Sequence, residues 1–436
     1  MSATIDRAIG LDFGTTNTVA AVPRGLTDTN LVPLDHGGEV FRSALCFWQD
    51  ESVCGGLAVE AGPAAIQEYV QFPSDSRFLQ SFKTVAASSS FESAPVFERR
   101  FRFEQLGQMF LEKLTEHAGG VLDRLDRVVV GRPVTWAGAQ PNEALARSRY
   151  DAMFAAFAPE VHYVYEPLAA AYGHAAGLTH SATLLVADFG GGTSDFSVVR
   201  VEEPGAAKRC IPLGHAGIGM AGDRFDARIL DKLVLPILGK GGCYRSFDKV
   251  LEIPGGYFAD VADWSKFALM RNRRTLAELE RLRSSAVDPD AIGRMIALIE
   301  NELGFPLYDA VGKLKQSLST QQSATFSFTG AGVAIEADVT RAEFENWIGD
   351  DLKRMAATVD NALAAAGVEA TAIDRVFLTG GTSLVPAVRS IFTRRFGEDR
   401  IETGGELTSI AHGLALIAQE DDMAAWTVAS DAAVVI

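Results

Sequence analysis

Two strings that both begin with the letters DFG are the residues of this sequence best suited to chemistry. The first, DFGTTNT, covers residues 12–18, and the second, DFGGGTSDF, covers residues 188–196. An apolar, β-prone run lies on both sides of each string, so each predicts the turn of a β-hairpin. Glycines let backbone N–H groups approach an anion closely, and threonine hydroxyls add donors at the same point. The sequence therefore predicts two phosphate-binding turns.

An aspartate ends the strand before each turn, Asp12 in the first copy and Asp188 in the second. A carboxylate would repel a phosphate unless a hydrated cation lay between them, and Mg²⁺ keeps several waters while taking one or two carboxylates. We therefore predict that Asp12 and Asp188 hold Mg²⁺ and that two facing hairpins clamp the phosphates of a nucleotide. For one copy alone, a glycine-rich turn with a capping aspartate remains open, and the repetition weakens that alternative.

Composition and charge limit the classes of protein that fit. The chain has 436 residues, 47% of them hydrophobic, which suits two globular domains with buried cores. Its formal net charge of -16 argues against nucleic acid as a partner. No run approaches the ~18 apolar residues of a membrane span, so no membrane association is expected. Four scattered cysteines form no CxxC pair, so the sequence predicts a reducing, cytoplasmic location and no zinc site.

Strand and helix signals alternate along the chain, which indicates an α/β protein. The string RVVVGRPV predicts a buried strand that ends at Pro133, and residues 260–303 read as a charged helical region. After Gln419 we expect a loosely packed tail. Its apolar end, AAVVI, could pack on the protein, extend a sheet edge or recruit another chain.

Five strings give the sequence a resemblance to a known family. IGLDFGTTNT, YVYEPLAAAYG, LLVADFGGGTSDFSVV, AGDRFD and VFLTGGTSLVP occur in the order found in the ATPase domain of DnaK-type chaperones of the heat-shock protein 70 family. The resemblance implies the duplicated actin-like ATPase fold, an α/β architecture of two ribonuclease H-like lobes around a nucleotide cleft. In length the chain resembles the short YegD-like subgroup, so no peptide-binding domain is expected.

The same resemblance implies the domain boundaries. Lobe I would cover residues 1–180 with an outer subdomain at about 32–103, and lobe II would cover 181–420 with an outer subdomain at about 225–305. A C-terminal tail would follow at 421–436. The outer subdomains, where the resemblance is thinnest, would set the choice of partner.

The resemblance also implies roles for matching residues. Lys83 would be the catalytic lysine, Glu166 would orient the attacking water, and Asp195 and Thr193 would act beside it. Phosphoryl transfer depends on positioning and charge neutralisation, which these groups supply. The residues expected to bind ATP or ADP are Gly14, Thr15, Thr16, Asn17, Gly190, Gly191, Gly192, Lys315, Ser319, Gly380 and Gly381. Asp12 and Asp188 would hold the water shell of Mg²⁺, and Pro133 would be the switch proline that links nucleotide state to the interface.

Simpler roles compete with three of these assignments. Lys83 could be an exposed surface lysine, because lysine is mostly a surface residue. Glu166 could compensate the charge of a helix N-terminus, and Asp195 could cap a turn.

Two positions depart from the family pattern. The chaperones sandwich the adenine ring between arginines, and the matching positions here hold Gln316 and Leu384. The acid expected shortly before the adenosine-contacting lysine is replaced by Gly312. Because the cation–π contacts are lost, we expect weaker or less base-selective nucleotide binding.

The string GIGMAG, residues 217–222, fits the GxGxxG pattern of dinucleotide-binding proteins. It follows the second phosphate hairpin, where the resemblance places a glycine turn of the ATPase core, so we favour that interpretation. His174 and His215 lie near the expected cleft but belong to no metal-binding pattern, and we expect them to be neutral packing residues.

Three functions from different classes stay open. The first is a DnaK-like chaperone switch that binds Mg-ATP and hydrolyses it slowly, with a protein client or co-chaperone as partner. The second is a sugar-kinase-like phosphotransferase, and the third is a non-hydrolysing, actin-like nucleotide-binding protein. The string EPLAAAYG favours the first.

Overall fold

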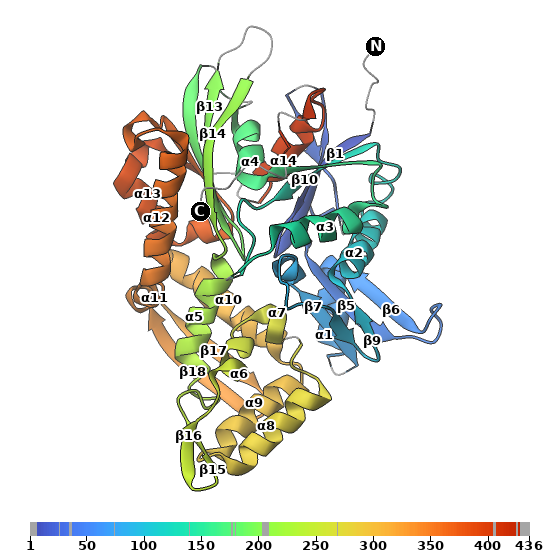
Figure 1. Cartoon of the computed structure of the whole chain (residues 1–436), viewed down its shortest axis with the longest axis vertical. Helices are drawn as coiled ribbons and strands as arrows, with labels where there is room; N and C mark the ends of the chain where they lie inside the picture. The colour runs from blue at the N-terminus through green and yellow to red at the C-terminus, as the bar shows by residue number, and fades with distance from the viewer. Residues whose placement is uncertain are drawn as a thin grey trace. The chain divides into compact units, whose positions relative to one another are not determined.

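The structure is a computed structural model, and it divides into two compact units (Figure 1). It describes residues 7–25, 27–34, 37–73, 75–138, 140–175, 178, 180–202, 209–267, 269–403, 407–423 and 426–427. Unit 1 consists of residues 1–67, 80–222 and 352–436, and unit 2 of residues 68–79 and 223–351. These units are compact groups of residues and do not correspond to the two expected lobes, so the lobe boundary near residue 180 stays a prediction.

Unit 1 contains two large β-sheets, and both have the same topology. Their strand orders are β11-β10-β1-β2-β3, with β4 also paired to β2, and β20-β19-β12-β13-β14. The strands of the first sheet are β1 (Ala8–Phe13), β2 (Asn17–Pro23), β3 (Thr29–Leu31), β4 (Phe41–Arg42), β10 (Arg127–Arg132) and β11 (Glu160–Tyr165). Those of the second are β12 (Ala182–Phe189), β13 (Ser194–Glu202), β14 (Arg209–Ile218), β19 (Arg375–Thr379) and β20 (Ile401–Thr403).

The pairing within the two sheets repeats in direction. In each sheet an antiparallel hairpin, β1–β2 or β12–β13, is extended on one side by an antiparallel strand. On the other side of each hairpin two parallel strands follow. The predicted duplicated α/β fold is therefore confirmed, and the two DFG strings occupy equivalent places in its two copies.

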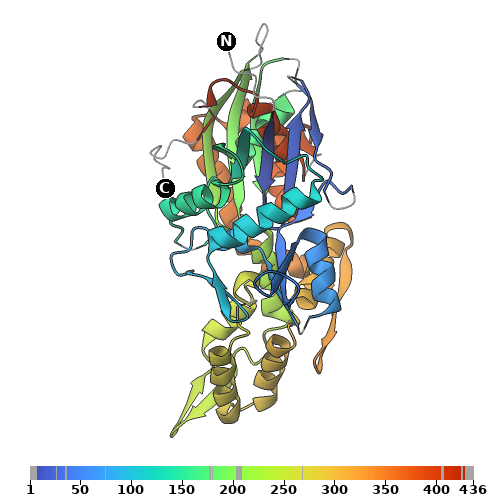
Figure 2. The same ribbon diagram turned by 90° about the vertical axis from the view of Figure 1, so that its right-hand side faces the viewer.

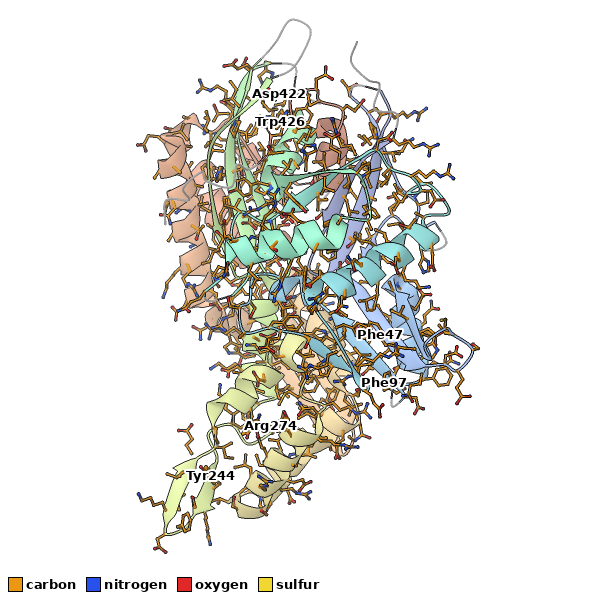
Figure 3. The ribbon with its side chains drawn as sticks, turned by 45° about the vertical axis from the view of Figure 1, so that its right-hand side comes forward. Phe47, Phe97, Tyr244, Arg274, Asp422 and Trp426 are labelled. Atoms are coloured by element: carbon orange, nitrogen blue, oxygen red, sulfur yellow. The ribbon has the colours of Figure 1, made fainter. Side chains whose placement is uncertain are left out.

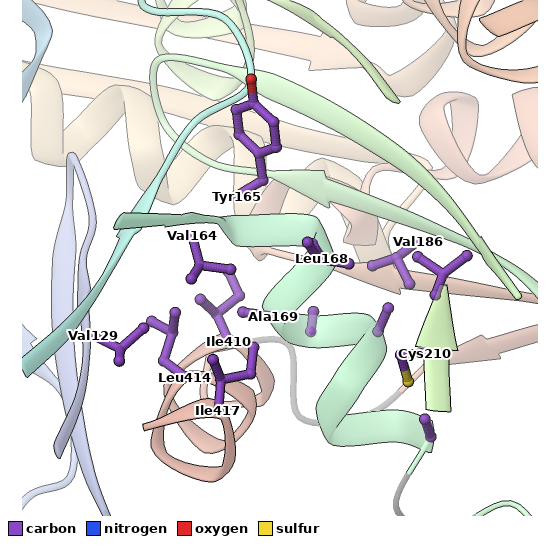
Figure 4. Close-up of a cluster of buried hydrophobic side chains, with 14 of the residues drawn as sticks. Val129, Val164, Tyr165, Leu168, Ala169, Val186, Cys210, Ile410, Leu414 and Ile417 are labelled. Atoms are coloured by element: carbon purple, nitrogen blue, oxygen red, sulfur yellow. The ribbon is translucent and has the colours of Figure 1, made fainter. Parts of the chain in front are cut away.

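A tight crossing of α4 (Glu166–Ala175) and α14 (Ser409–Ile417) joins the two copies. Figure 4 shows aliphatic side chains of β10, β11, α4, β12 and α14 gathered in one core. A Cβ atom placed on Gly413 would lie only 1.7 Å from the carbonyl oxygen of Ala169, and one on Gly173 would lie 3.1 Å from that of Ser409. The two backbones therefore touch, and the crossing has room only for glycine at residue 413.

An aromatic core lies beneath the first hairpin. Phe13 packs against Phe82, Phe110 and Tyr150, and Trp136 meets the Tyr150 ring edge-on at 4.9 Å between centroids. Helices α2 and α3, which lie side by side, contribute to this core (Figures 1 and 2). The remaining elements within unit 1 are α2 (Phe103–His117), α3 (Glu143–Phe154), α13 (Pro386–Phe396), β5 (Ala44–Gln49), β6 (Leu57–Ala61), β8 (Ala94–Val96), β9 (Arg99–Phe101), η1 (Phe82–Val85), η2 (Ala370–Ala372), η3 (Gly381–Leu384) and η4 (Glu398–Arg400).

Unit 2 is mainly helical and has its own core. Trp264 packs edge-on against Tyr308, and Glu302 accepts hydrogen bonds from Arg77 and Arg271 at 2.6 and 2.7 Å. Its elements are α6 (Gly255–Val261), α7 (Trp264–Phe267), α8 (Arg273–Ser285), α9 (Pro289–Glu300), α10 (Gly304–Thr320), α11 (Arg341–Trp347), β15 (Cys243–Ser246), β16 (Lys249–Glu252), β17 (Ser323–Gly330) and β18 (Val333–Thr340). Four elements run across a boundary between the units: α1 (Gly62–Gln71), β7 (Ser76–Gln80), α5 (Gly222–Leu233) and α12 (Gly349–Ala366).

The chain after Gln419 packs more tightly than the sequence predicts. Met423 is buried in the core of unit 1, and the ring of Trp426, which is labelled in Figure 3, meets that of Tyr172 edge-on with 4.9 Å between the centroids. The expectation of a loose tail is thus wrong for these residues, because Met423 joins the core cluster of unit 1 and Trp426 packs on Tyr172 of α4. The AAVVI end lies outside the described residues. In the described part of the chain, no helix combines the length and the apolar character that crossing a bilayer requires.

The helix crossing yields a test of stability. We expect Gly413→Ala to lower the midpoint of thermal unfolding, because overpacking of this kind costs about 1–3 kcal/mol. Gly312→Ala is the matched control: it also changes a glycine inside a helix, but nothing lies within 4 Å of the added Cβ. There the better helix propensity of alanine should leave the midpoint unchanged or raise it. Equal midpoints for the two variants would show that the backbones do not touch.

Candidate active site

The two glycine turns have the same geometry and lie next to each other within unit 1. The Gly14 N–H donates to the Asn17 carbonyl oxygen over 3.0 Å, and the Gly190 N–H donates to that of Thr193 over 3.0 Å. A Cβ atom placed on Gly192 would lie 3.4 Å from the Thr15 hydroxyl oxygen. Backbone N–H groups and hydroxyls of both predicted phosphate-binding turns are thus brought together.

Side chains that the sequence analysis missed hold the first turn. Ser43 donates its hydroxyl to the Gly14 carbonyl oxygen at 2.7 Å, and its backbone N–H donates to the carbonyl of Thr16 at 2.9 Å. Arg42 donates to the Asn17 side chain at 3.3 Å. Ser43 carries no recognisable sequence signal, because only the pairing of β4 with β2 brings it to the turn.

The second turn is held by the loop that contains Gly380 and Gly381. Gly380 has a φ angle of 82°, and a Cβ atom there would lie 2.1 Å from the carbonyl oxygen of Phe189. The Thr382 hydroxyl donates to the Gly190 carbonyl oxygen at 3.2 Å. The close approach and the left-handed backbone both require glycine at residue 380, which places this predicted nucleotide-binding loop against the second hairpin.

Lys83 and Glu166 form a buried ion pair. The Lys83 Nζ atom lies 2.7 Å from Glu166 Oε1, and each side chain is only 6% exposed. Burial alone would lower the pKa of Lys83, but the charges of Glu166, Tyr150 and Asp12 raise it, and the net shift is upward. The alternative that Lys83 is a surface lysine is therefore wrong. Glu166 is the first residue of α4, so it also carries negative charge at the positive end of that helix.

Three aspartates lie close enough to this pair to interact with it electrostatically. Burial raises the pKa of Asp188 well above its ordinary value, and the charges of Glu166 and Asp12 raise it further. Burial and Glu166 also raise the pKa of Asp12, while Lys83 lowers it. Carboxylates crowded in this way are stabilised by a cation that neutralises them.

The donor set fits a cation held through water. No group of three or more His, Cys, Asp or Glu side chains in the described ranges is arranged to ligate one ion directly. Mg²⁺ commonly keeps most of its waters and takes only one or two carboxylates, which matches Asp12 and Asp188 at equivalent places in the two hairpins.

Asp195 is fully buried and is held by a neighbouring loop. Its Oδ1 atom accepts hydrogen bonds from the backbone N–H groups of Val134 at 2.9 Å and Thr135 at 3.1 Å. Burial and then the charge of Glu166 raise the pKa of Asp195 to about 7, although these hydrogen bonds and one from Thr193 lower it. Asp195 therefore does more than cap its own turn, because both backbone donors lie about sixty residues earlier in the chain.

The GIGMAG string serves the same site. A Cβ atom on Gly217 would lie 2.4 Å from Asp195 Oδ1 and 2.9 Å from the Thr135 nitrogen, so glycine leaves room for the hydrogen bonds to Asp195. This supports the ATPase-core interpretation of the string over a dinucleotide site. His215 packs on Tyr165 at 4.6 Å and His174 stacks on Phe377 at 3.9 Å, and burial lowers the pKa of both histidines, as expected of neutral packing residues.

The remaining predicted nucleotide contacts belong to unit 2. Lys315 and Ser319 lie on α10, where Lys315 pairs with Asp226 at 2.7 Å and the Ser319 hydroxyl donates to the Lys315 carbonyl oxygen. Gln316 follows Lys315 on that helix. Leu384, the other position expected to depart from the family pattern, lies in unit 1 and is 58% exposed.

A duplicated α/β fold whose two glycine hairpins meet beside paired acids is the actin-like ATPase fold. A family model described as Hsp70 protein matches residues 8–242 and 301–420, which is most of the chain. The chain therefore belongs to the Hsp70 family. Membership supports a nucleotide-binding, chaperone-type function.

The match is interrupted within unit 2. Residues 243–300, which the family model does not cover, contain the hairpin β15–β16 and helices α6 to α9. Tyr244 of this hairpin and Arg274 of α8 are labelled in Figure 3. This segment falls inside residues 225–305, the stretch expected to form the outer subdomain of lobe II.

The raised pKa of Asp195 predicts how stability depends on pH. Between its ordinary pKa of 3.8 and the folded value of about 7, the folded state binds this proton more tightly than the unfolded state does. The stability that this group contributes should therefore fall as the pH rises through that window. In Mg²⁺-free, nucleotide-free protein we expect Asp195→Asn to depend less on pH and to be more stable than the parent above about pH 7. Thermal unfolding measured in chelator over a range of pH tests this. The surface control, Asp151→Asn, should keep the pH profile of the parent, and a parent-like profile in Asp195→Asn would contradict the prediction.

Proposed function

We propose that this chain is a DnaK-like, chaperone-type ATPase that binds Mg-ATP, hydrolyses it slowly and changes conformation as it does so. The observation that carries this proposal is the buried Lys83–Glu166 pair beside Asp12, Asp188 and Asp195. A lysine so completely buried and surrounded by carboxylates is not needed to hold a fold together, because an apolar core would do so as well. The same groups are the ones that phosphoryl transfer requires.

In this proposal each residue has a distinct task. Glu166 accepts a hydrogen bond from the attacking water and orients it, while Lys83 is kept protonated by Glu166 and faces the developing negative charge. Asp195, with Thr193 beside it, orients groups from the second hairpin. The N–H groups and hydroxyls of both turns bind the phosphates, and Asp12 and Asp188 would hold Mg²⁺, whose charge would offset that of the phosphates. The residues proposed for these phosphate contacts are Gly14, Thr15, Thr16, Asn17, Gly190, Gly191 and Gly192.

The proposal also includes the expected adenosine contacts, the lobe boundary, the cellular location and the partner. Lys315, Ser319, Gly380 and Gly381 would bind the adenosine, and the two lobes would meet near residue 180. A reducing, cytoplasmic location stays part of the proposal, because the four scattered cysteines of the sequence form no CxxC pair. A protein client or co-chaperone is the proposed partner, and the likeness to the short YegD-like subgroup stays a prediction.

Replacing the buried lysine tests the reaction. We expect Lys83→Met to bind ATP with an affinity close to that of the parent but to hydrolyse it at least about a hundredfold more slowly, because a preorganised charge is lost. Binding is measured by calorimetry with Mg²⁺, and hydrolysis by single-turnover kinetics. Lys113→Met removes a lysine on α2 that pairs with Glu116, and it should leave both quantities unchanged.

Each outcome of that experiment has a clear meaning. Equal hydrolysis by the parent and Lys83→Met would contradict the assignment of Lys83. Binding without hydrolysis in the parent would indicate a nucleotide sensor, and ADP release that depends on a metabolite would indicate a phosphotransferase. Sedimentation with ATP would reveal the filament-forming alternative.

The two departures from the family pattern predict a gain of affinity. Leu384→Arg restores a cation where the family stacks arginine on the adenine ring, and such a contact contributes roughly 0.5–2 kcal/mol, or about two- to thirtyfold in affinity. Calorimetry should therefore show tighter ATP binding by Leu384→Arg. Leu407→Arg adds the same charge at another exposed leucine of unit 1 and should not have this effect. An equal gain in both variants would mean that charge alone attracts the nucleotide and that Leu384 does not face the base.

A further inference from the structure

Arg132 is a buried cation that the proposed reaction does not use. It ends strand β10 and is only 8% exposed. Its guanidinium carbon lies over two aromatic rings, 5.6 Å from the centroid of Trp136 and 5.1 Å from that of Tyr165. Its carboxylate partner, Glu143, is half exposed and stands 3.7 Å from Nη2. Two cation–π contacts and one long ion pair therefore hold this buried side chain.

This fixed guanidinium holds one end of a peptide group whose other end holds Asp195. Arg132 Nε donates a hydrogen bond to the carbonyl oxygen of Pro133 at 3.1 Å. The N–H of the same peptide group belongs to Val134 and donates to Asp195 Oδ1 at 2.9 Å. A peptide group is planar, and none in the described residues is cis, so fixing the direction of its C=O also fixes the direction of its N–H.

The same arginine also contacts the strand that leads to Glu166. Arg132 and Tyr165 are partner residues in the parallel pairing of β10 with β11, and Glu166 follows Tyr165 directly. Figure 4 shows the Tyr165 ring extending away from the aliphatic core, with its oxygen farthest from it. Stacking of Arg132 on that ring therefore supports the point at which β11 turns into α4.

We propose that Arg132 is a positioning residue of the active site: by binding the Pro133 carbonyl and stacking on Tyr165 and Trp136, it fixes the orientation of Asp195 and the approach to Glu166. This inference rests on the proposed ATPase function. A lysine would keep the positive charge but could not stack as a plane and donate sideways from Nε at the same time. The role therefore requires arginine in particular, and charge alone does not fulfil it.

Arg132→Lys separates positioning from binding. Since a small misplacement of a reacting group costs up to about a hundredfold in rate, we expect the single-turnover rate constant to fall about tenfold to a hundredfold. The Kd for Mg-ATP should stay within about twofold, because the contacts described for Arg132 are with Pro133, Glu143, Trp136 and Tyr165, which lie outside the phosphate-binding turns. Hydrogen exchange at the Val134 amide should become faster in nucleotide-free protein, a readout that needs no activity.

Arg127→Lys is the matched control. Arg127 lies at the other end of β10, is buried to the same degree, and donates to the carbonyl oxygens of Ala418 and Glu420. The Arg127→Lys variant should be less stable than the parent, but its single-turnover rate constant and its hydrogen exchange at the Val134 amide should be unchanged. Equal losses of rate in Arg127→Lys and Arg132→Lys would overturn the proposal, since both would then act only through stability.

A second variant covers the case in which Arg132→Lys fails to fold. Trp136→Leu removes one stacking face but keeps Arg132, and it should lower the rate constant by a smaller factor at unchanged ATP affinity. A parent-like rate in Trp136→Leu, or in a folded Arg132→Lys, would refute the role of Arg132. An inactive parent would instead refute the proposed ATPase function, and exchange at Val134 would still decide whether Arg132 fixes the peptide.

Discussion

The buried pair of Lys83 and Glu166 is the constraint on which the rest of the site depends. Removing two charges from water is unfavourable by several kcal/mol per ion, and only close contact with good geometry offsets this. Here the contact is 2.7 Å, but three further aspartates lie close enough to interact with the pair, so the cluster would carry more negative than positive charge if every acid were ionised. A fold that keeps such a cluster together must hold each carboxylate by rigid backbone on several sides.

The duplicated sheets meet this requirement. In both hairpins the N–H of the glycine two residues after the aspartate donates to a carbonyl oxygen three residues further on. Asp12 and Asp188 therefore lie at equivalent strand ends. The crossing of α4 and α14 then brings the two copies together, and its spacing is set by direct backbone contact at Gly413. A contact between backbones cannot adjust as a contact between flexible side chains can. The separation of the two aspartates is therefore fixed by parts of the chain that carry no chemistry themselves.

The sequence could predict what depends on local pattern and on repetition. The two DFG turns, the order of strands and helices around them and the duplication all follow from short strings of residues. Burial of Lys83 could not be predicted in this way, because SFKTV has no periodicity and folds into a short η1 turn whose surroundings come from distant elements. Ser43, Arg132 and Tyr150 were missed for the same reason. Gly413 looks like a weak point in a helix, and only the structure shows that it touches Ala169.

The crowding of buried carboxyl groups also bears on how a switch could work. A ligand can shift a conformational equilibrium only through different affinities for the two states, so a nucleotide must find something in one state that the other lacks. In the ligand-free site the crowding of Asp12, Asp188 and Asp195 raises their pKa values, which means that the ionised form there is destabilised. Binding of a cation with the nucleotide would relieve this strain and stabilise the arrangement that holds the acids together. The free energy for a conformational change would thus come from the carboxylates that the fold holds close together. The rate of hydrolysis would depend on how well groups such as Arg132 orient those carboxylates.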